Sequence, residues 1–135
     1  PGKGGALLFY WHGTGGNAQE AMRTIPAAVR TEIISGGGII ASFNGSQSSG
    51  SGGDCSGTGA HNQADFNAAD LIAACAVKNH GIDPRRIYTT GCSAGGLQSG
   101  CMSQVRSSYI AAAAPNSGGG VFPQMWQDKS GISAW

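Results

Sequence analysis

Short apolar runs without polar alternation recur along the chain and indicate strands that are buried on both faces. Residues 6–11 (Ala-Leu-Leu-Phe-Tyr-Trp) form the first run, and residues 39–43 form the second. Residues 87–90, after a turn at Asp83-Pro84, and residues 110–114 are expected to be the third and fourth strands. Continuous apolar strands are typical of parallel sheets, because helices cover both faces of such a sheet.

Helical periodicity fills the segments between these strands. The first helix is expected after Asn17, whose spacing to Glu20 is a capping signature, and Pro26 is expected to kink or restart it. The second begins near Asp65 and ends at Gly81, and the last follows the third strand. The apolar positions expected to face inward are Ala21, Ile25, Val29 and Ile33, then Phe66, Ala69, Ile72, Ala73, Ala76 and Val77, and finally Ala94, Leu97, Cys101 and Val105.

This alternation of strands and helices predicts the α/β class, with a mostly parallel sheet and helices on both faces. The 135 residues suit a single domain, 1–135. Residues 44–63 are rich in Gly and Ser and contain Cys55. A flexible linker would split so short a domain, and long loops inside compact domains are usually functional. We therefore expect residues 44–63 to form an ordered active-site loop.

Charge and composition narrow the possible partners. The formal net charge is +1, only 11% of the residues are charged, and no basic cluster is longer than Arg85-Arg86. Nucleic acid is therefore not expected as a partner. No apolar run reaches the roughly 18 residues of a membrane-spanning helix, so no membrane span is expected. Nothing near Asp54 or Asp65 completes an oxygen cage, so we expect no metal and no other cofactor.

The strongest chemical signal is Gly91-Cys92-Ser93-Ala94-Gly95, a G-x-S-x-G motif between an expected strand and an expected helix. A serine hydroxyl is a weak nucleophile, so it must be exposed on a strained turn where a histidine can take its proton. The flanking glycines let the backbone crowd there without Cβ clashes. Ser93 is the predicted nucleophile, and the alternative is a Gly- and Ser-rich turn that fits the motif by chance.

A second motif, His12-Gly13-Thr14-Gly15-Gly16, directly follows the first strand. Enzymes with the G-x-S-x-G turn place their other oxyanion donor at this point. The backbone N–H groups of Thr14 and Ala94 are the predicted oxyanion hole. His12 and Gly13 are expected to order the oxyanion turn, and His12 is not expected to be the general base. A phosphate-binding loop is disfavoured, because neither G-x-G-x-x-G nor the Walker pattern is present.

The chain resembles the polyhydroxybutyrate-depolymerase and feruloyl-esterase group of secreted α/β-hydrolases. The resemblance lies in residues 83–96 (D-P-R-R-I-Y-T-T-G-C-S-A-G-G) together with the upstream H-G-T-G-G motif. The resemblance covers most of residues 6–118. It implies the α/β-hydrolase fold and a serine esterase with an acyl-Ser93 intermediate. The implied substrates are polyesters or feruloyl- and acetyl-polysaccharides, and the acyl and alcohol groups stay open.

The chain departs from this group where the triad should be completed. α/β-Hydrolases order their triad as Ser, then Asp or Glu, then His. After Ser93 the chain has one acidic residue, Asp128, and no histidine. We therefore expect residues 1–135 to be the N-terminal half of a longer domain, whose C-terminal half is a partner that supplies acid and base. His61 in the Gly/Ser loop is the alternative base. A catalytically inactive hydrolase-like binding or assembly module is the alternative function.

Four cysteines permit two disulfides, and their spacing does not resemble paired zinc knuckles. We therefore expect an oxidising compartment, so the protein is predicted to be secreted or periplasmic. The predicted pairs are Cys55–Cys92 and Cys75–Cys101, which join elements on the same face or edge of the expected fold. Cys92 also resembles the cysteine before the nucleophile in fungal tannases and feruloyl esterases, which bonds to a cysteine beside the catalytic histidine. Since this chain has no such His-Cys pair, a bond from Cys92 to a cysteine beyond Trp135 is the alternative.

Overall fold

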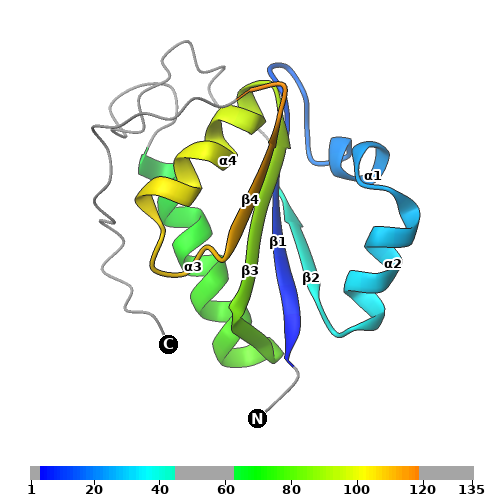
Figure 1. The fold of residues 1–135 in the computed structure, drawn as a ribbon, viewed down its shortest axis with the longest axis vertical. Coiled ribbons are helices and arrows are strands. Elements are labelled where there is room, and N and C mark those ends of the chain that lie inside the picture. The colour runs from blue at the N-terminus through cyan, green and yellow to red at the C-terminus, as the bar shows by residue number, and fades with distance from the viewer. Residues whose placement is uncertain (1–3, 45–62, 119–135) are drawn as a thin grey trace.

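The computed structural model describes residues 4–44 and 63–118, and in these it shows an α/β fold with a four-stranded, all-parallel sheet. The strand order is β2-β1-β3-β4. Helices α3 and α4 lie on one side of the sheet, and α1 and α2 lie on the other (Figure 1). The strands are β1 (Gly5–Trp11), β2 (Ile39–Ser42), β3 (Ile82–Cys92) and β4 (Ala112–Asn116). The helices are α1 (Glu20–Thr24), α2 (Ala27–Ser35), α3 (Gln63–His80) and α4 (Ala94–Val105).

The predicted class is therefore confirmed. A parallel sheet between two helical layers is compatible with the α/β-hydrolase fold, but other α/β proteins share it. Among the described residues, no helix is both long enough and apolar enough to cross a membrane.

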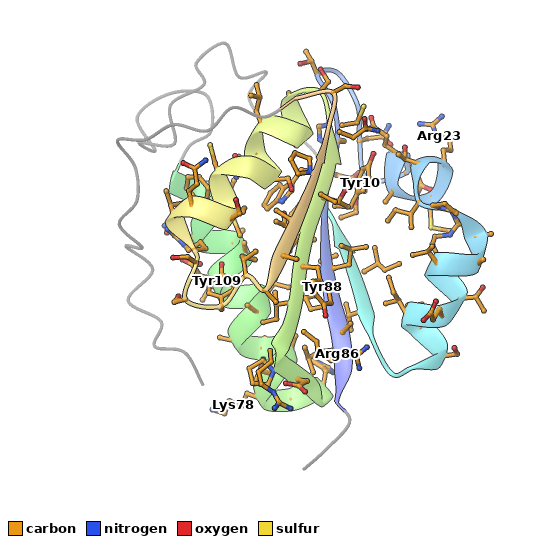
Figure 2. The ribbon with its side chains drawn as sticks, in the orientation of Figure 1. Tyr10, Arg23, Lys78, Arg86, Tyr88 and Tyr109 are labelled. Carbon is orange, nitrogen blue, oxygen red and sulfur yellow. The ribbon has the colours of Figure 1, made fainter. Side chains whose placement is uncertain are left out.

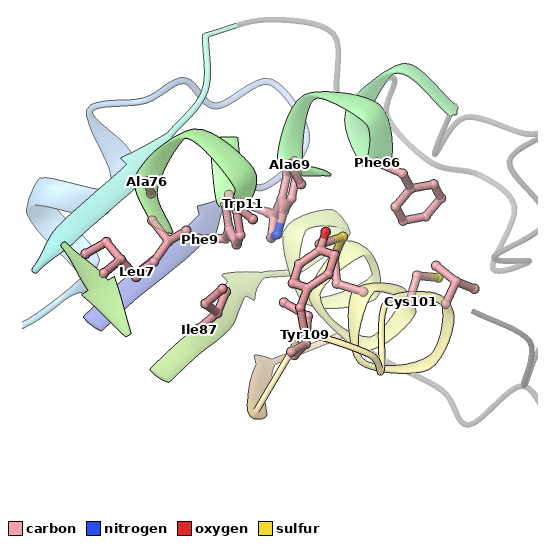
Figure 3. Packing of buried hydrophobic residues seen from close by; sticks show 14 residues of the cluster. Leu7, Phe9, Trp11, Phe66, Ala69, Ala76, Ile87, Cys101 and Tyr109 are labelled. Carbon is pink, nitrogen blue, oxygen red and sulfur yellow. The ribbon is translucent and has the colours of Figure 1, made fainter. Parts of the chain in front are cut away.

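The sequence of β1 has no alternation because both of its faces are buried. Leu7, Phe9 and Trp11 belong to the main core with α3 and α4 (Figure 3). Tyr10 belongs to a second cluster, with Ala21 of α1, on the other face. Successive strand residues point to opposite faces, so each face of β1 needs its own apolar set. The strand is the centre of both hydrophobic layers.

A buried ion pair ties α3 to the end of α4. Arg106 is 2% exposed, and its Nε donates to Oδ1 of Asp70 at 2.8 Å. The hydroxyl of Tyr109 donates to the same oxygen at 2.6 Å. The Arg106 guanidinium also lies over the ring of Phe66, 5.1 Å from its centroid. Since breaking such a buried pair costs about 3–5 kcal/mol, it holds α4 firmly against α3.

The segment before β2 differs from the prediction. It forms two helices, because Ile25 has an extended backbone (ψ 121°) and α2 begins only after Pro26. A residue before proline is driven out of the helical region, and proline lacks the N–H that would continue the helix. Ile25 is buried as predicted, but Val29 is 42% exposed and no residue of α2 is fully buried. Of the four positions predicted to face inward in this segment, only Ala21 and Ile25 are therefore buried.

The third and fourth strands also have different bounds from those predicted. The turn predicted at Asp83-Pro84 lies inside β3, where the register with β1 is irregular. There the side-chain hydrogen bond from Arg85 lowers the pKa of Asp83 to about 2. The fourth strand lies two residues further along the chain than predicted, and Ile110, where the strand was expected to begin, is buried ahead of it.

The tightest backbone contact in the fold joins the end of β1 to the start of α4. A Cβ atom placed on Gly95 would lie 1.9 Å from the carbonyl oxygen of Trp11. A Cβ atom on Gly91 would lie 2.4 Å from the carbonyl oxygen of Gly95. Because these neighbours are backbone atoms, they cannot rotate away. Glycine is therefore required at both positions.

We expect Gly95→Ala to destabilise the protein by about 4 kcal/mol, the range of severe core substitutions. Alanine gains about 1 kcal/mol in helix propensity, and the clash outweighs this gain. Gly37→Ala is the control, because Gly37 has φ 75° and a Cβ atom placed on it would meet nothing within 4 Å. It should cost only about 1–2 kcal/mol in backbone strain. Urea unfolding measures both, and equal losses would contradict the steric argument.

Candidate active site

Ser93 lies at the junction of β3 and α4, at the carboxyl edge of the sheet. It is exposed and is the N-cap residue of α4, with φ 55° and ψ −117°. Among the described non-glycine residues, only Ser93 and Ser117 have positive φ. A backbone strained in this way costs about 1–3 kcal/mol and tends to occur at functional sites. The strained backbone and the exposure predicted for Ser93 are confirmed. Its role as nucleophile stays a prediction.

Neighbouring backbone groups hold Ser93 in this conformation. Its N–H donates to the carbonyl oxygen of Asn116 at 2.9 Å, and its own carbonyl accepts from the N–H of Leu97 at 3.0 Å. A Cβ atom on Gly118 would lie 2.1 Å from the Ser93 carbonyl oxygen. Both sides of the residue are thus fixed by β4, α4 and the segment after β4. The packing of these elements offsets the strain.

The predicted oxyanion turn lies beside Ser93. A Cβ atom on Gly13 would be 3.7 Å from the Cβ of Ser93 and 3.4 Å from the carbonyl oxygen of Cys92. The turn is closed by the Gly16 N–H, which donates to the carbonyl oxygen of Gly13 at 2.9 Å. The structure thus brings together two motifs that are some 80 residues apart in the chain. Thr14, which follows Gly13, is exposed.

Glu20 holds the N–H side of this turn, a role that the sequence analysis missed. Its Oε1 accepts the Gly13 N–H at 3.0 Å and the Tyr10 hydroxyl at 2.9 Å. Tyr10 reaches it from the α1 side of the sheet (Figure 2). Burial is the main cause that raises the pKa of Tyr10 to about 12, so the phenol stays a donor. The capping interaction predicted from the spacing of Asn17 and Glu20 does not form, because the Glu20 carboxylate binds the turn. Asn17 Oδ1 instead accepts a hydrogen bond from the Gln19 N–H.

The carbonyl side of the turn is held by His12. The Nδ1 of His12 lies 2.7 Å from the carbonyl oxygen of Gly13. In a trans peptide the N–H points away from the preceding carbonyl, so fixing the Gly13 carbonyl also aims the Thr14 N–H. Ala94 is the first residue of α4, and its N–H has no acceptor within the helix. Among the described residues, neither N–H has a hydrogen-bond acceptor. Both are open to an acceptor from outside these residues, and their role as oxyanion donors stays a prediction.

Neither described histidine is placed to act as the general base. His12 is 3% exposed, and its ring is held against the oxyanion turn. His80 ends α3, and the carbonyl of the next residue, Gly81, bonds to Gly5 at the start of β1. His80 is therefore at the opposite end of the strands from Ser93. His61 and Asp128 lie outside the described residues, as does nearly all of the predicted 44–63 loop.

Both predicted disulfides are wrong, because Cys75 and Cys92 are free thiols. Cys75 is exposed on the outer side of α3, whereas Cys101 is buried in the core between α3 and α4. The two therefore face different environments. Cys101 is not a free thiol, and its partner lies outside the described residues, as does Cys55.

Among the described residues, no group of three His, Cys, Asp or Glu side chains could hold a metal ion. An apolar pocket of about 540 Å³ lies between α1, α2 and β2, and Met22, Ile34 and Ile40 are among its lining residues. None of the predicted site residues lines it, so it has no direct part in the site at Ser93.

No protein-family model matches the chain, and no curated protein matches it significantly. Function is therefore inferred from the geometry around Ser93.

We expect Ser93→Gly to be about 1 kcal/mol more stable than Ser93→Ala. Glycine relieves a strain of about 1–3 kcal/mol and gives back about 0.5–1 kcal/mol through its freedom in the unfolded chain. Ser93→Ala is the matched control, because it removes the hydroxyl but keeps the strain. Since that hydroxyl makes no capping hydrogen bond, its loss costs little. Urea unfolding of both variants measures the difference, and equal stability would argue against a strained Ser93.

Proposed function

We propose that this chain carries the nucleophile and the oxyanion hole of a serine esterase that hydrolyses carboxylic esters. The observation that carries the proposal is the strained, exposed Ser93 between β3 and α4, beside the His12–Gly16 turn. A serine in this geometry lies where an incoming carbonyl can reach it. The same edge of the sheet offers the Thr14 and Ala94 amides as donors.

The reaction follows from these parts in two steps. Ser93 Oγ attacks the ester carbonyl while a general base takes its proton, and the alcohol leaves with that proton when the tetrahedral intermediate collapses. Water then attacks the acyl-Ser93 carbonyl, which releases the acid and restores Ser93. In both steps the oxyanion accepts hydrogen bonds from the amides of Thr14 and Ala94. Losing one such donor typically costs about 2.7–4 kcal/mol of transition-state stabilisation.

Helix α4 adds to this stabilisation. It has 12 residues and begins directly after Ser93, so its N-terminus faces the position where negative charge develops. The partial positive charge at a helix N-terminus favours an anion there. His12 and Gly13 have a supporting role in the proposal, since they set the orientation of the Thr14 amide.

The acid and the base of the triad come, in this proposal, from outside the described residues. The group that residues 83–96 resemble supports a polyester or a feruloyl- or acetyl-polysaccharide as substrate, and a secreted or periplasmic protein. An inactive binding or assembly module is the second candidate, since the described residues place no histidine where it could serve Ser93. Activity and covalent labelling separate the two.

The test is ester hydrolysis and phosphonate labelling of the full-length protein. We expect it to hydrolyse p-nitrophenyl butyrate and to react with a fluorophosphonate at Ser93, as mapped by peptide mass spectrometry. Ser93→Ala should abolish labelling and lower kcat/KM by at least about 10³-fold, because the nucleophile is lost. Ser117→Ala is the matched control, an exposed serine that also has positive φ. It should leave both readouts unchanged.

A folded protein that shows neither hydrolysis nor labelling would support the inactive module. Labelling at another residue would contradict the assignment of Ser93. The 135-residue chain alone should show at most the residual acceleration of about 10³–10⁴ over water that an oxyanion hole and binding provide. Ordinary turnover by that chain would place the base inside it, and His61 would then be the candidate.

A further inference from the structure

The carboxylate of Glu20, the first residue of α1, lies against the oxyanion turn with both of its oxygens. Oε1 accepts the Gly13 N–H at 3.0 Å. Oε2 faces Gly16, where a Cβ atom would lie 2.4 Å from it. A side chain at position 16 would therefore push the carboxylate away from the turn. The absence of one lets Glu20 reach the Gly13 N–H.

Tyr10 fixes this carboxylate to the central strand. Its hydroxyl donates to the same Oε1 at 2.9 Å. The Tyr10 side chain is 1% exposed and packs with Ala21 and Ile25 on the α1 side of the sheet (Figure 2). Because a buried residue of β1 has little freedom, it holds Oε1 in a defined place. Glu20 thus transmits the position of the strand to the turn.

Gly13 is the residue of the turn that needs to be held most. A glycine backbone has more conformational freedom than any other, so each of its two peptide groups can rotate unless it is bonded. The carbonyl of Gly13 accepts the Gly16 N–H at 2.9 Å and lies 2.7 Å from Nδ1 of His12. Its N–H bonds to Glu20. Without Glu20, the peptide between His12 and Gly13 would lose this bond.

The same bond decides which amide of the turn is open to a substrate. The N–H of Gly13 bonds to Glu20, and the N–H of Gly16 bonds to the Gly13 carbonyl. Neither is free to donate to an oxyanion. The Thr14 N–H lies between them in the chain and has no acceptor among the described residues.

We propose that Glu20 is a positioning residue of the oxyanion hole, which occupies the Gly13 N–H and so aims the Thr14 N–H at the substrate. The proposal rests on the proposed esterase function. It assigns Glu20 a task of reach and geometry, in which an oxygen must lie within hydrogen-bond distance of Gly13. The negative charge of the side chain is not what the task requires.

Two substitutions in the full-length protein separate reach from charge. Glu20→Gln keeps an acceptor oxygen at the same reach and removes the charge, so kcat should stay within about threefold of the wild type. Glu20→Asp keeps the charge but is shorter by one methylene group. Misplacing a catalytic group by about 1 Å can cost roughly 100-fold. We therefore expect kcat of Glu20→Asp to fall by about 10- to 100-fold with KM nearly unchanged, because the oxyanion forms after the substrate binds.

A merely structural role of Glu20 would give the opposite order. A negative charge favours the N-terminus of a helix, so a residue that only stabilised α1 would be replaced better by Asp than by Gln. Glu32→Asp is the control, because Glu32 is the only other glutamate of the chain and is exposed on α2. It should leave kcat and KM unchanged.

The backbone amide of Gly13 gives a readout that needs no substrate. A hydrogen bond to a carboxylate moves an amide proton downfield in ¹H–¹⁵N spectra. We expect the Gly13 signal to move upfield in Glu20→Asp and to move less in Glu20→Gln. Glu32→Asp should not move it.

Wild-type kcat in Glu20→Asp overturns the proposal, and so does an equal loss in Glu20→Asp and Glu20→Gln or an unmoved Gly13 signal in Glu20→Asp. If Glu20→Asp does not fold, Tyr10→Phe replaces it. That variant removes one of the two donors to Oε1 and should lower kcat by about 3- to 10-fold, whereas unchanged kcat would overturn the proposal. If the wild-type protein hydrolyses no ester, the proposed function fails, and the Gly13 signal still reports whether Glu20 holds the turn.

Discussion

The close approach of two backbones, at the end of β1 and the start of α4, determines the rest of the site. No side chain fits between Gly95 and the carbonyl of Trp11, where a Cβ atom would be only 1.9 Å from oxygen. This contact places the N-terminus of α4 beside the turn that follows β1. Ser93 and the His12–Gly16 turn therefore meet because the elements that carry them pack without side chains between them.

The site then depends on groups that are costly to place and that the surrounding fold stabilises. Ser93 has a strained backbone, and His12 and Asp65 bury polar atoms. Together such features cost several kcal/mol, a large part of the 5–15 kcal/mol that typically separates folded from unfolded protein. The core on the α3–α4 side and the Arg106–Asp70 pair hold α3 and α4 in place against this cost. Strain is concentrated at the carboxyl edge, where the proposed chemistry occurs.

The sequence predicts most of the fold, because local patterns determine it. Unalternating apolar runs identify β1 and β2, and the inward face of α3 follows its periodicity. Ser93 can be recognised because a motif and its strand-to-helix context coincide. The role of Glu20 cannot be recognised from the sequence. Its spacing to Asn17 suits both a helix cap and a hydrogen bond to the turn, and only the tertiary structure decides between them. The cysteine pairing is also beyond reach, since it depends on which side of a helix faces the core.

A crystal structure of the Ser93 adduct with an organophosphonate tests the proposed oxyanion hole most directly. Its phosphoryl oxygen occupies the position of the oxyanion in the tetrahedral intermediate. We expect this oxygen to lie about 2.7–3.1 Å from the backbone nitrogens of both Thr14 and Ala94. We also expect the Gly13 carbonyl to keep its bond to His12. An adduct whose phosphoryl oxygen points to solvent, or contacts neither amide, would contradict the proposed oxyanion hole.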